Sequence, residues 1–259
     1  MEPRTFAMGD IHGAHKALVQ CLERCNFNNE IDTLIQLGDV ADGWSETYEC
    51  VEELLKIKNL IAIKGNHDDW TLTLMTTGVH PGLPQGGRAT LDSYLKRNEH
   101  SQLYFPESHI KFFQYQHLYY KDDDNKLFVH GGFNRHMLLK DHKDPFVFFW
   151  DRDLWHTALS YEAMNKGLVY HGELEEDDSY KNKNVYNFKI KEILSEIFIG
   201  HTTTGLWSKS TPMQAGPIWN LDTGAGFEGV LTIMDVKTHE YWQSDRVKTL
   251  YPEEAGRRH

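Results

Sequence analysis

The chain has 259 residues, of which 40% are hydrophobic and 12% aromatic, enough to bury one large core or two small ones. Its 38 acidic and 27 basic side chains give a formal net charge of −11, which argues against nucleic acid or an anionic membrane as the main partner. No apolar stretch reaches the roughly 20 residues of a membrane helix, and no basic-then-apolar leader precedes the first predicted strand, so we expect a cytoplasmic protein.

The first predicted strand, Thr5–Met8, runs into a glycine turn that carries two metal-ligating residue types. Asp10 and His12 lie one residue apart between Gly9 and Gly13. A carboxylate and an imidazole so spaced can bind one divalent metal from a tight turn, and the glycines let the backbone bend sharply on either side. Such a pattern is common by chance, so it needs support from the rest of the chain.

Two helical patterns follow and separate the first three predicted strands. Residues 14–25 carry apolar side chains at a helical period, and Ser45 can cap a second such pattern that runs to Ile57. The order strand, helix, strand, helix, strand predicts βαβ units and a parallel core. The three cysteines, Cys21, Cys25 and Cys50, are typical of buried, reduced thiols rather than of a metal site.

Four later apolar runs repeat the construction of the first strand. Each ends at a glycine beside a ligand-type residue: Thr33–Leu37 before Gly38-Asp39, Leu60–Ile63 before Gly65-Asn66, Leu127–Val129 before His130-Gly131, and Ile197–Ile199 before Gly200-His201. In an open α/β sheet, sites form outside the carboxyl ends of the strands. The strand ends should therefore gather the following residues around one crevice: Asp10, His12, Asp39, Asn66, His130 and His201.

After the third predicted strand the pattern changes to short helices. Helical stretches at 70–75, 90–96 and 106–115 are interrupted by a loop rich in glycine and proline at 77–87. We interpret residues 68 to about 118 as a helical insertion beside the site. Further on, residues 121–125 predict a charged hairpin turn, and the acidic segment 171–183 predicts a surface loop.

The C-terminal part alternates like strands at 217–221, 230–235 and 239–243. Antiparallel strands there would add a second sheet and give a sandwich of two sheets flanked by helices. The segment Gly224–Gly229 matches the spacing of a dinucleotide-binding fingerprint, but a strand pattern follows it where that fingerprint requires a helix. We therefore reject nucleotide binding there and expect a glycine-rich turn close to the metals.

Together, the ordered motifs resemble those of the calcineurin-like metallophosphoesterases. They are Gly9-Asp-Ile-His-Gly13, Gly38-Asp39…Asp42-Gly43, Gly65-Asn66-His67-Asp68, His130-Gly131-Gly132 and Gly200-His201-Thr202. The sequence looks most similar to the serine/threonine phosphoprotein phosphatases, including their short bacterial and phage members, over residues 4–226. The resemblance implies an α/β fold with two mixed β-sheets flanked by helices. The spread of the motifs favours a single domain over residues 1–259.

The resemblance also implies a centre of two divalent metal ions and a role for each ligand. Asp10 and His12 would hold the first ion, Asn66, His130 and His201 the second, and Asp39 would bridge them. This mixture of donors suits manganese, with iron or zinc as alternatives, better than magnesium alone. A bridging water would lose its proton and attack phosphorus. His67 would protonate the leaving group, and Asp42 would orient His67.

One family arginine is missing from this sequence. The family motif continues Asp-Arg-Gly where this chain has Asp42-Gly43. A second family arginine follows a tryptophan, and Arg152 in Trp150-Asp-Arg152 fits it, so we predict that Arg152 binds the phosphate. Arg88 or Arg135 could replace the missing group, although a surface position is the simpler interpretation of each.

The leading interpretation is a metal-dependent phosphomonoesterase that acts on phosphoserine or phosphothreonine in proteins, with phosphotyrosine as a further candidate substrate. The first alternative is a hydrolase of dinucleoside polyphosphates or another small phosphate ester, since bacterial relatives divide between these activities. A non-catalytic binding module is a third possibility, against which the complete ligand set argues. The sequence leaves the physiological substrate, the native metals, the oligomeric state and any regulator open.

Overall fold

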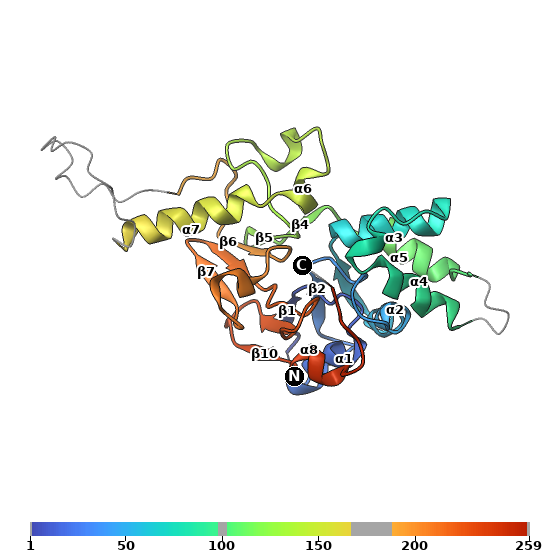
Figure 1. Ribbon diagram of the computed structural model, residues 1–259. Helices are drawn as coiled ribbons and strands as arrows, with labels where there is room; N and C mark the ends of the chain where they lie inside the picture. Colours follow the sequence, from blue (N-terminus) through green and yellow to red (C-terminus); the bar gives the residue numbers. More distant parts are fainter. Residues whose placement is uncertain (1, 98–102, 167–187, 258–259) are drawn as a thin grey trace, which may run out of the picture.

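A computed structural model describes residues 2–97, 103–166 and 188–257. Its described strands form two five-stranded sheets, ordered β10-β9-β1-β2-β3 and β4-β5-β6-β8-β7. Helices flank the pair of sheets, and the loops at the strand ends meet near the centre of the view (Figure 1). The expected sandwich of two mixed sheets flanked by helices is therefore confirmed.

The first sheet contains the βαβ units that the sequence predicts. Strands β1, β2 and β3 are parallel, and α1 and α2 connect them. The sheet is buried on both faces, because Phe6 and Met8 pack against the helices while Ala7 packs between the two sheets. The bounds of its strands and covering helices are β1 Thr5–Met8, α1 His15–Arg24, β2 Thr33–Gln36, α2 Thr47–Leu54, β3 Asn59–Ala62, β9 Thr232–Asp235, β10 Tyr241–Gln243 and α8 Val247–Leu250.

The second sheet has a parallel centre, β5, β6 and β8, with antiparallel strands β4 and β7 at its edges. Phe128 on β5 and Phe198 on β6 stack at 5.0 Å between ring centroids and face the first sheet. On the other face Leu127 and Ile197 pack against Trp155 of α7. The bounds are β4 Tyr119–Lys121, β5 Lys126–Val129, η2 Leu139–Asp141, α6 Val147–Trp150, α7 Asp153–Asn165, β6 Glu196–Ile199, η4 Thr204–Trp207, β7 Met213–Ala215 and β8 Ile218–Asn220.

The C-terminal strands do not build the second sheet in the way that the sequence suggested. Strands β9 and β10 extend the first sheet, with β9 antiparallel to β1, whereas β8 joins the second sheet parallel to β6. Ile233 of β9 packs on the helix side of the first sheet and Met234 packs between the sheets. Alternation in the sequence identifies such a strand but does not specify which sheet edge receives it.

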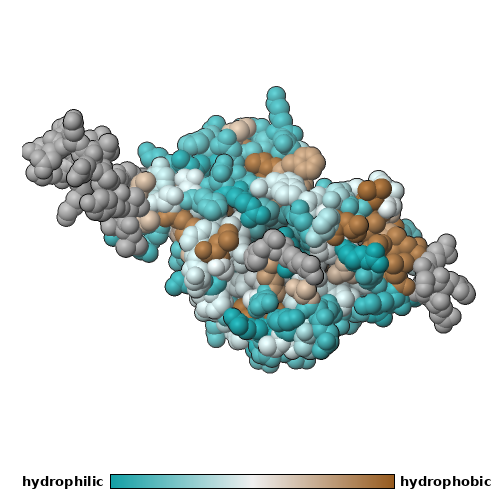
Figure 2. All heavy atoms as spheres, in the orientation of Figure 1, coloured by the Kyte–Doolittle hydropathy of each residue, from teal (hydrophilic) through white to brown (hydrophobic). Residues whose placement is uncertain are grey.

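The predicted insertion is helical, although its first helix starts at Asn66, shortly after the end of β3 at Ala62, and not at Trp70. The elements are α3 Asn66–Thr77, η1 Leu83–Gln85, α4 Gly87–Leu95 and α5 Glu107–Gln114. Most of the face in Figure 2 is hydrophilic, and hydrophobic residues gather on its right side over these helices. Val79 and Leu83, in the segment between α3 and α4, are exposed.

Three smaller sequence predictions have different outcomes. Ser45 does not cap α2, because its N–H and hydroxyl both donate to the carboxylate of Glu254 at 3.0 and 2.6 Å. The charged turn at 121–125 does join β4 to β5 in a hairpin, whereas the predicted acidic loop at 171–183 lies outside the described residues. Among the described residues, no helix is both long and apolar enough to cross a membrane.

Candidate metal centre

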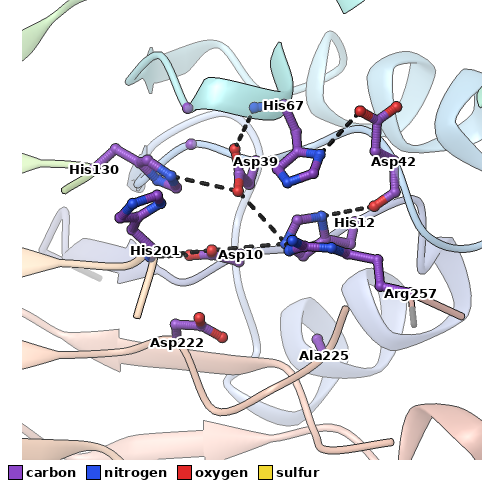
Figure 3. A network of polar contacts seen from close by, with 12 residues as sticks. Asp10, His12, Asp39, Asp42, His67, His130, His201, Asp222, Ala225 and Arg257 are labelled. Atoms are coloured by element: carbon purple, nitrogen blue, oxygen red, sulfur yellow. Dashed lines mark hydrogen bonds and ion pairs between the residues drawn. The ribbon is translucent and has the colours of Figure 1, made fainter. Parts of the chain in front are cut away.

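Five of the six predicted ligands are seen together in Figure 3, and the sixth, Asn66, contacts His130; they lie at the carboxyl ends of strands from both sheets. Each lies within four residues of the end of a strand: Asp10 and His12 after β1, Asp39 after β2, Asn66 after β3, His130 after β5 and His201 after β6. All six side chains are buried, in a chain whose acidic residues are mostly on the surface. The side chains that follow these strand ends are therefore neighbours in the structure, and their role as metal ligands stays a prediction.

The ligand atoms form two clusters that share Asp39. In the first, the ligand atoms of Asp10, His12 and Asp39 all lie within 4.8 Å of one another, and in the second the same holds for Asp39, His130 and His201. The shared Asp39 Oδ2 lies 3.6 Å from His12 Nε2 and 3.4 Å from His130 Nε2. Asn66 Oδ1 lies 3.3 Å from His130 Nε2 and completes the second cluster. A carboxylate in both clusters is what two neighbouring ions would require of a bridging ligand.

Backbone carbonyl groups orient two of the histidine rings so that their Nε2 atoms face these clusters. His12 Nδ1 lies 2.7 Å from the Asp42 carbonyl oxygen, and His130 Nδ1 lies 2.8 Å from that of Leu37. Carbonyl oxygens only accept hydrogen bonds, so each Nδ1 carries a proton and Nε2 is the ring nitrogen left to face the clusters. The buried Nε2 of His201 has no hydrogen-bond partner within the described part of the chain. Carboxylate, amide and imidazole donors arranged in this way fit divalent transition metals.

The ligand loops adopt a backbone conformation that ordinary residues seldom take. His12, Asp39, Asp42 and His201 have φ angles of 52°, 56°, 67° and 66°. The left-handed region costs a non-glycine residue roughly 1–2 kcal/mol, and such residues concentrate at functional sites. The loops therefore carry strain that the surrounding contacts must offset.

Burial and crowding of charge perturb several of these groups. Burial raises the pKa of Asp10 well above its usual value, and the neighbouring carboxylate of Asp222 adds to the rise. Burial opposes ionisation of Asp39 too, yet His130 and His67 hold the pKa of its carboxyl well below the usual range. Burial lowers the pKa of His12 to about 3, and the charge of Arg257 contributes. Burial acts against a charge on His130 as well, but Asp39 raises the pKa of that ring to about 9, so this buried group of carboxylates favours a positive charge among them.

The predicted pair His67 and Asp42 is in contact and extends to a third residue. His67 Nδ1 lies 3.0 Å from Asp42 Oδ2, while His80 Nε2 lies 3.0 Å from Asp42 Oδ1. The hydroxyl of Thr90 donates to the same Oδ1 at 2.8 Å. Burial acts to raise the pKa of the Asp42 carboxyl. The hydrogen bonds from His67 and His80 outweigh burial, so this pKa is lowered from its ordinary value. Sequence reasoning missed His80, because it lies in the loop of residues 77–87 and no recognisable motif surrounds it.

Asp68 connects two of the ligand loops by hydrogen bonds. The motif Gly65-Asn66-His67-Asp68 did not indicate this structural role. Its buried carboxylate accepts hydrogen bonds from the backbone N–H groups of Asp39 at 2.9 Å, Val40 at 2.8 Å and Gly65 at 3.1 Å. The side-chain amide of Gln116 donates a further bond at 2.8 Å. The loop after β2 is thereby joined to the start of α3.

Of the predicted arginines, Arg152 lies closest to the centre. Its Nη1 donates to the carbonyl oxygen of His201 and to the hydroxyl of Thr202, both at 2.9 Å. Burial lowers the pKa of Arg152, whereas the carboxylates of Asp222 and Asp39 oppose this shift. Among the described residues, no ion pair joins Arg152 to the neighbouring Asp151 or Asp153, and its hydrogen-bond partners there are His201 and Thr202.

The two other arginines considered from the sequence lie elsewhere. Arg88 is exposed on α4 and pairs with Asp92, and Arg135 donates to the Lys189 carbonyl oxygen. The structure instead brings Arg257, which the sequence did not single out, to 2.9 Å from His12 Nε2. The expected glycine-rich turn also lies at the centre, because Gly226 packs directly against the His12 ring, where a side chain would collide.

Comparisons with known proteins agree on one family, although the relatives in it differ in activity. The family model described as calcineurin-like phosphoesterase matches residues 3–205. The chain is 24% identical over 270 residues to a symmetrical bis(5'-nucleosyl)-tetraphosphatase of Neisseria meningitidis, covering 92% of this chain and 94% of that protein. It is 31% identical over 121 residues to serine/threonine-protein phosphatase 2 of Escherichia coli, covering 46% and 53%. A crystal structure of a metallophosphoesterase from Sphaerobacter thermophilus aligns with a TM-score of 0.52 at 14% identity, covering 94% and 89%.

Proposed function

The chain belongs to the calcineurin-like phosphoesterases, and from that premise we propose that it is a phosphomonoesterase acting on phosphoserine and phosphothreonine in proteins. The observation that carries the proposal is the pair of ligand clusters joined at Asp39, with the His67–Asp42 pair beside them. Relatives that are serine/threonine phosphatases support this substrate class. The family also implies divalent metal ions.

We assign the six ligands to two ions, preferably manganese, with iron or zinc as alternatives. Asp10 and His12 would hold one ion, and Asn66, His130 and His201 the other, with Asp39 shared. Two such ions would lower the pKa of a water molecule and neutralise charge on the phosphoryl group. The support for this assignment is the shared carboxylate, the fixed Nδ1 contacts of His12 and His130, and the unpartnered His201 Nε2 within the described structure.

We assign His67 as the general acid for the leaving alkoxide. Its Nδ1 donates to Asp42, which leaves Nε2 to carry and release the proton. The buried Asp42 carboxylate fixes the orientation of the ring, and His80 and Thr90 on Asp42 Oδ1 hold that carboxylate in turn. His67 also lies edge-on to His12, with 5.1 Å between ring centroids, so the proton donor is next to the first cluster.

Arg152 is our candidate for binding the phosphoryl group. One of its nitrogens is held by His201 and Thr202, which fixes the guanidinium beside the second cluster. The remaining N–H groups could make charge-assisted hydrogen bonds to phosphoryl oxygens. The carboxylates of Asp222 and Asp39 act to raise the pKa of Arg152, which supports a position of its guanidinium close to the clusters.

A second candidate function is hydrolysis of symmetrical dinucleoside polyphosphates. The observation in its favour is the Neisseria relative, whose similarity runs over 92% of this chain, whereas the Escherichia phosphatase matches 46%. A side-by-side assay separates the two candidates: manganese-loaded protein is offered phosphoserine, phosphothreonine and phosphotyrosine peptides and diadenosine tetraphosphate. Preference for the dinucleotide by kcat/KM would overturn the phosphoprotein proposal. If the manganese-loaded protein turned over none of these esters, the result would support a non-catalytic module.

A further inference from the structure

The backbone at Gly43 cannot accept the arginine that the family motif carries there. Gly43 has a φ of 146°, and a Cβ built on it would lie 2.8 Å from the carbonyl oxygen of His12 and 3.0 Å from His12 Cβ. Real Cβ atoms essentially never come so close to backbone atoms, so no side chain fits without movement of the His12 loop. The next atom in line is Cγ of Arg257, at 3.4 Å. The side chain of Arg257 therefore runs past the position where the missing arginine would begin.

The C-terminal segment 251–257 is anchored to the loop that contains Gly43. Tyr251 stacks on the buried Trp44, with 5.3 Å between ring centroids, and its hydroxyl donates to Glu46. Glu254 accepts two hydrogen bonds from Ser45. These contacts hold the approach to Arg257 without using its side chain.

A turn at the end of this segment directs Arg257 into the site. Gly256 has a φ of 62° and lies against Trp44, where a Cβ would come within 2.6 Å of the ring. The N–H of Arg257 then donates to the Gly226 carbonyl oxygen at 2.9 Å. Only glycine adopts this turn without strain in so little space. The turn at Gly256 therefore allows Arg257 to place its guanidinium in the site.

The guanidinium of Arg257 is directed at the ligand clusters (Figure 3). Its Nη1 lies 2.9 Å from His12 Nε2, and its carbon lies 5.0 Å from the centre of the Phe227 ring. Its Nε is buried without a hydrogen-bond partner in the described part of the chain. The positive charge of Arg257 also acts on Arg152, which is held beside His201 of the second cluster. Two guanidinium groups facing one buried site favour an anion between them.

We propose that Arg257 is the second phosphate-binding arginine of this site and takes the place of the side chain missing at Gly43, an inference that rests on the proposed phosphatase function. His12 Nε2, its present acceptor, is the atom assigned to the first metal ion. Once that nitrogen holds an ion, the N–H groups of Arg257 have no acceptor of their own among the ligands and can donate to a phosphoryl oxygen. Arg152 and Arg257 would then grip the phosphoryl group from opposite sides.

The test compares Arg257→Ala and Arg257→Lys with Arg246→Ala, which removes an exposed arginine from the same end of the chain. Calorimetry measures inorganic phosphate binding to the manganese-loaded proteins and manganese binding to the metal-free proteins. We expect Arg257→Ala to weaken phosphate binding and to lower kcat/KM for p-nitrophenyl phosphate by roughly 10–100-fold. Lysine should restore part of the loss, because it cannot make a forked contact. Arg246→Ala should match the wild type.

The affinity for manganese distinguishes a phosphate-binding role of Arg257 from one in which Arg257 blocks the metal site. Because Arg257→Ala frees His12 Nε2, manganese should bind at least as tightly as in the wild type. Tighter manganese binding with raised turnover and unchanged phosphate affinity would overturn the proposal and make the C-terminal segment a block on the metal site. Unchanged values throughout would also overturn it. Thermal unfolding of each variant confirms that it folds. A wild type that binds phosphate through Arg257 but hydrolyses no ester would sink the proposed activity alone.

Discussion

Replacing Asp68 with alanine should show how far the centre depends on a residue that contacts none of the six ligand side chains. The carboxylate accepts four backbone hydrogen bonds, from Asp39, Val40, Ala41 and Gly65, and one from the side chain of Gln116. Alanine would leave these donors buried without their acceptor. Each unsatisfied buried donor costs about 1–3 kcal/mol, but water entering the space would satisfy some of them. We therefore expect a total loss of about 3–5 kcal/mol in the free energy of unfolding, comparable to breaking a buried ionic contact.

The loss should be specific to this carboxylate and should extend to metal binding. Asp92→Ala is the matched control, because it removes an exposed aspartate paired with Arg88 on α4, and such pairs contribute about 0–1 kcal/mol. Urea unfolding of the metal-free proteins gives the two free energies. Manganese titration should show weaker binding in Asp68→Ala, because the loop that carries Asp39 has lost its anchor. Equal stability of the two variants, with unchanged metal affinity, would refute this account of Asp68.

Three further predictions concern the ligands and the chemistry. Asp39→Asn should lower the affinity for metal at both clusters, and elemental analysis showing wild-type metal content would remove Asp39 from its shared position. His67→Asn should keep its metals but lose roughly 10²–10⁴-fold in kcat on alkyl phosphates, and less on p-nitrophenyl phosphate, whose leaving group needs no proton; an equal loss on both esters contradicts the acid role. Arg152→Ala should lower kcat/KM by roughly 10–100-fold, whereas Arg88→Ala should have little effect because Arg88 lies on the exposed face of α4. The reverse order would place the phosphate contact on the insertion.

The sequence was sufficient to predict which candidate ligands would lie together, because parallel strands bring their carboxyl ends to one edge of a sheet. Short apolar runs ending at a glycine and a ligand-type residue marked β1, β2, β3, β5 and β6. Five such repeats made it improbable that Asp10, Asp39 and His130 were ordinary surface residues, and the structure brings them together. The contact between His67 and Asp42 could be expected only through the family resemblance, since nothing in their spacing brings them together.

The remaining features depend on contacts that local patterns do not encode. Alternation marked β9 as a strand, but only packing placed it beside β1, where Ile233 and Met234 each face a different core. His80 and Asp68 acquire their roles from the folding of the insertion against the loop after β2.

Arg257 shows most clearly what the tertiary structure alone decided. In the sequence it is one of several charged residues near the C-terminus, 245 positions away from His12. Its place in the site depends on the stacking of Tyr251 on Trp44 and on the hydrogen bonds between Glu254 and Ser45. Each of these contacts joins segments about 200 residues apart, and such long-range pairs are selected by packing of the whole core rather than by the propensities of either segment. The sequence thus determined which residues could bind metal, and the tertiary structure determined which arginine faces them.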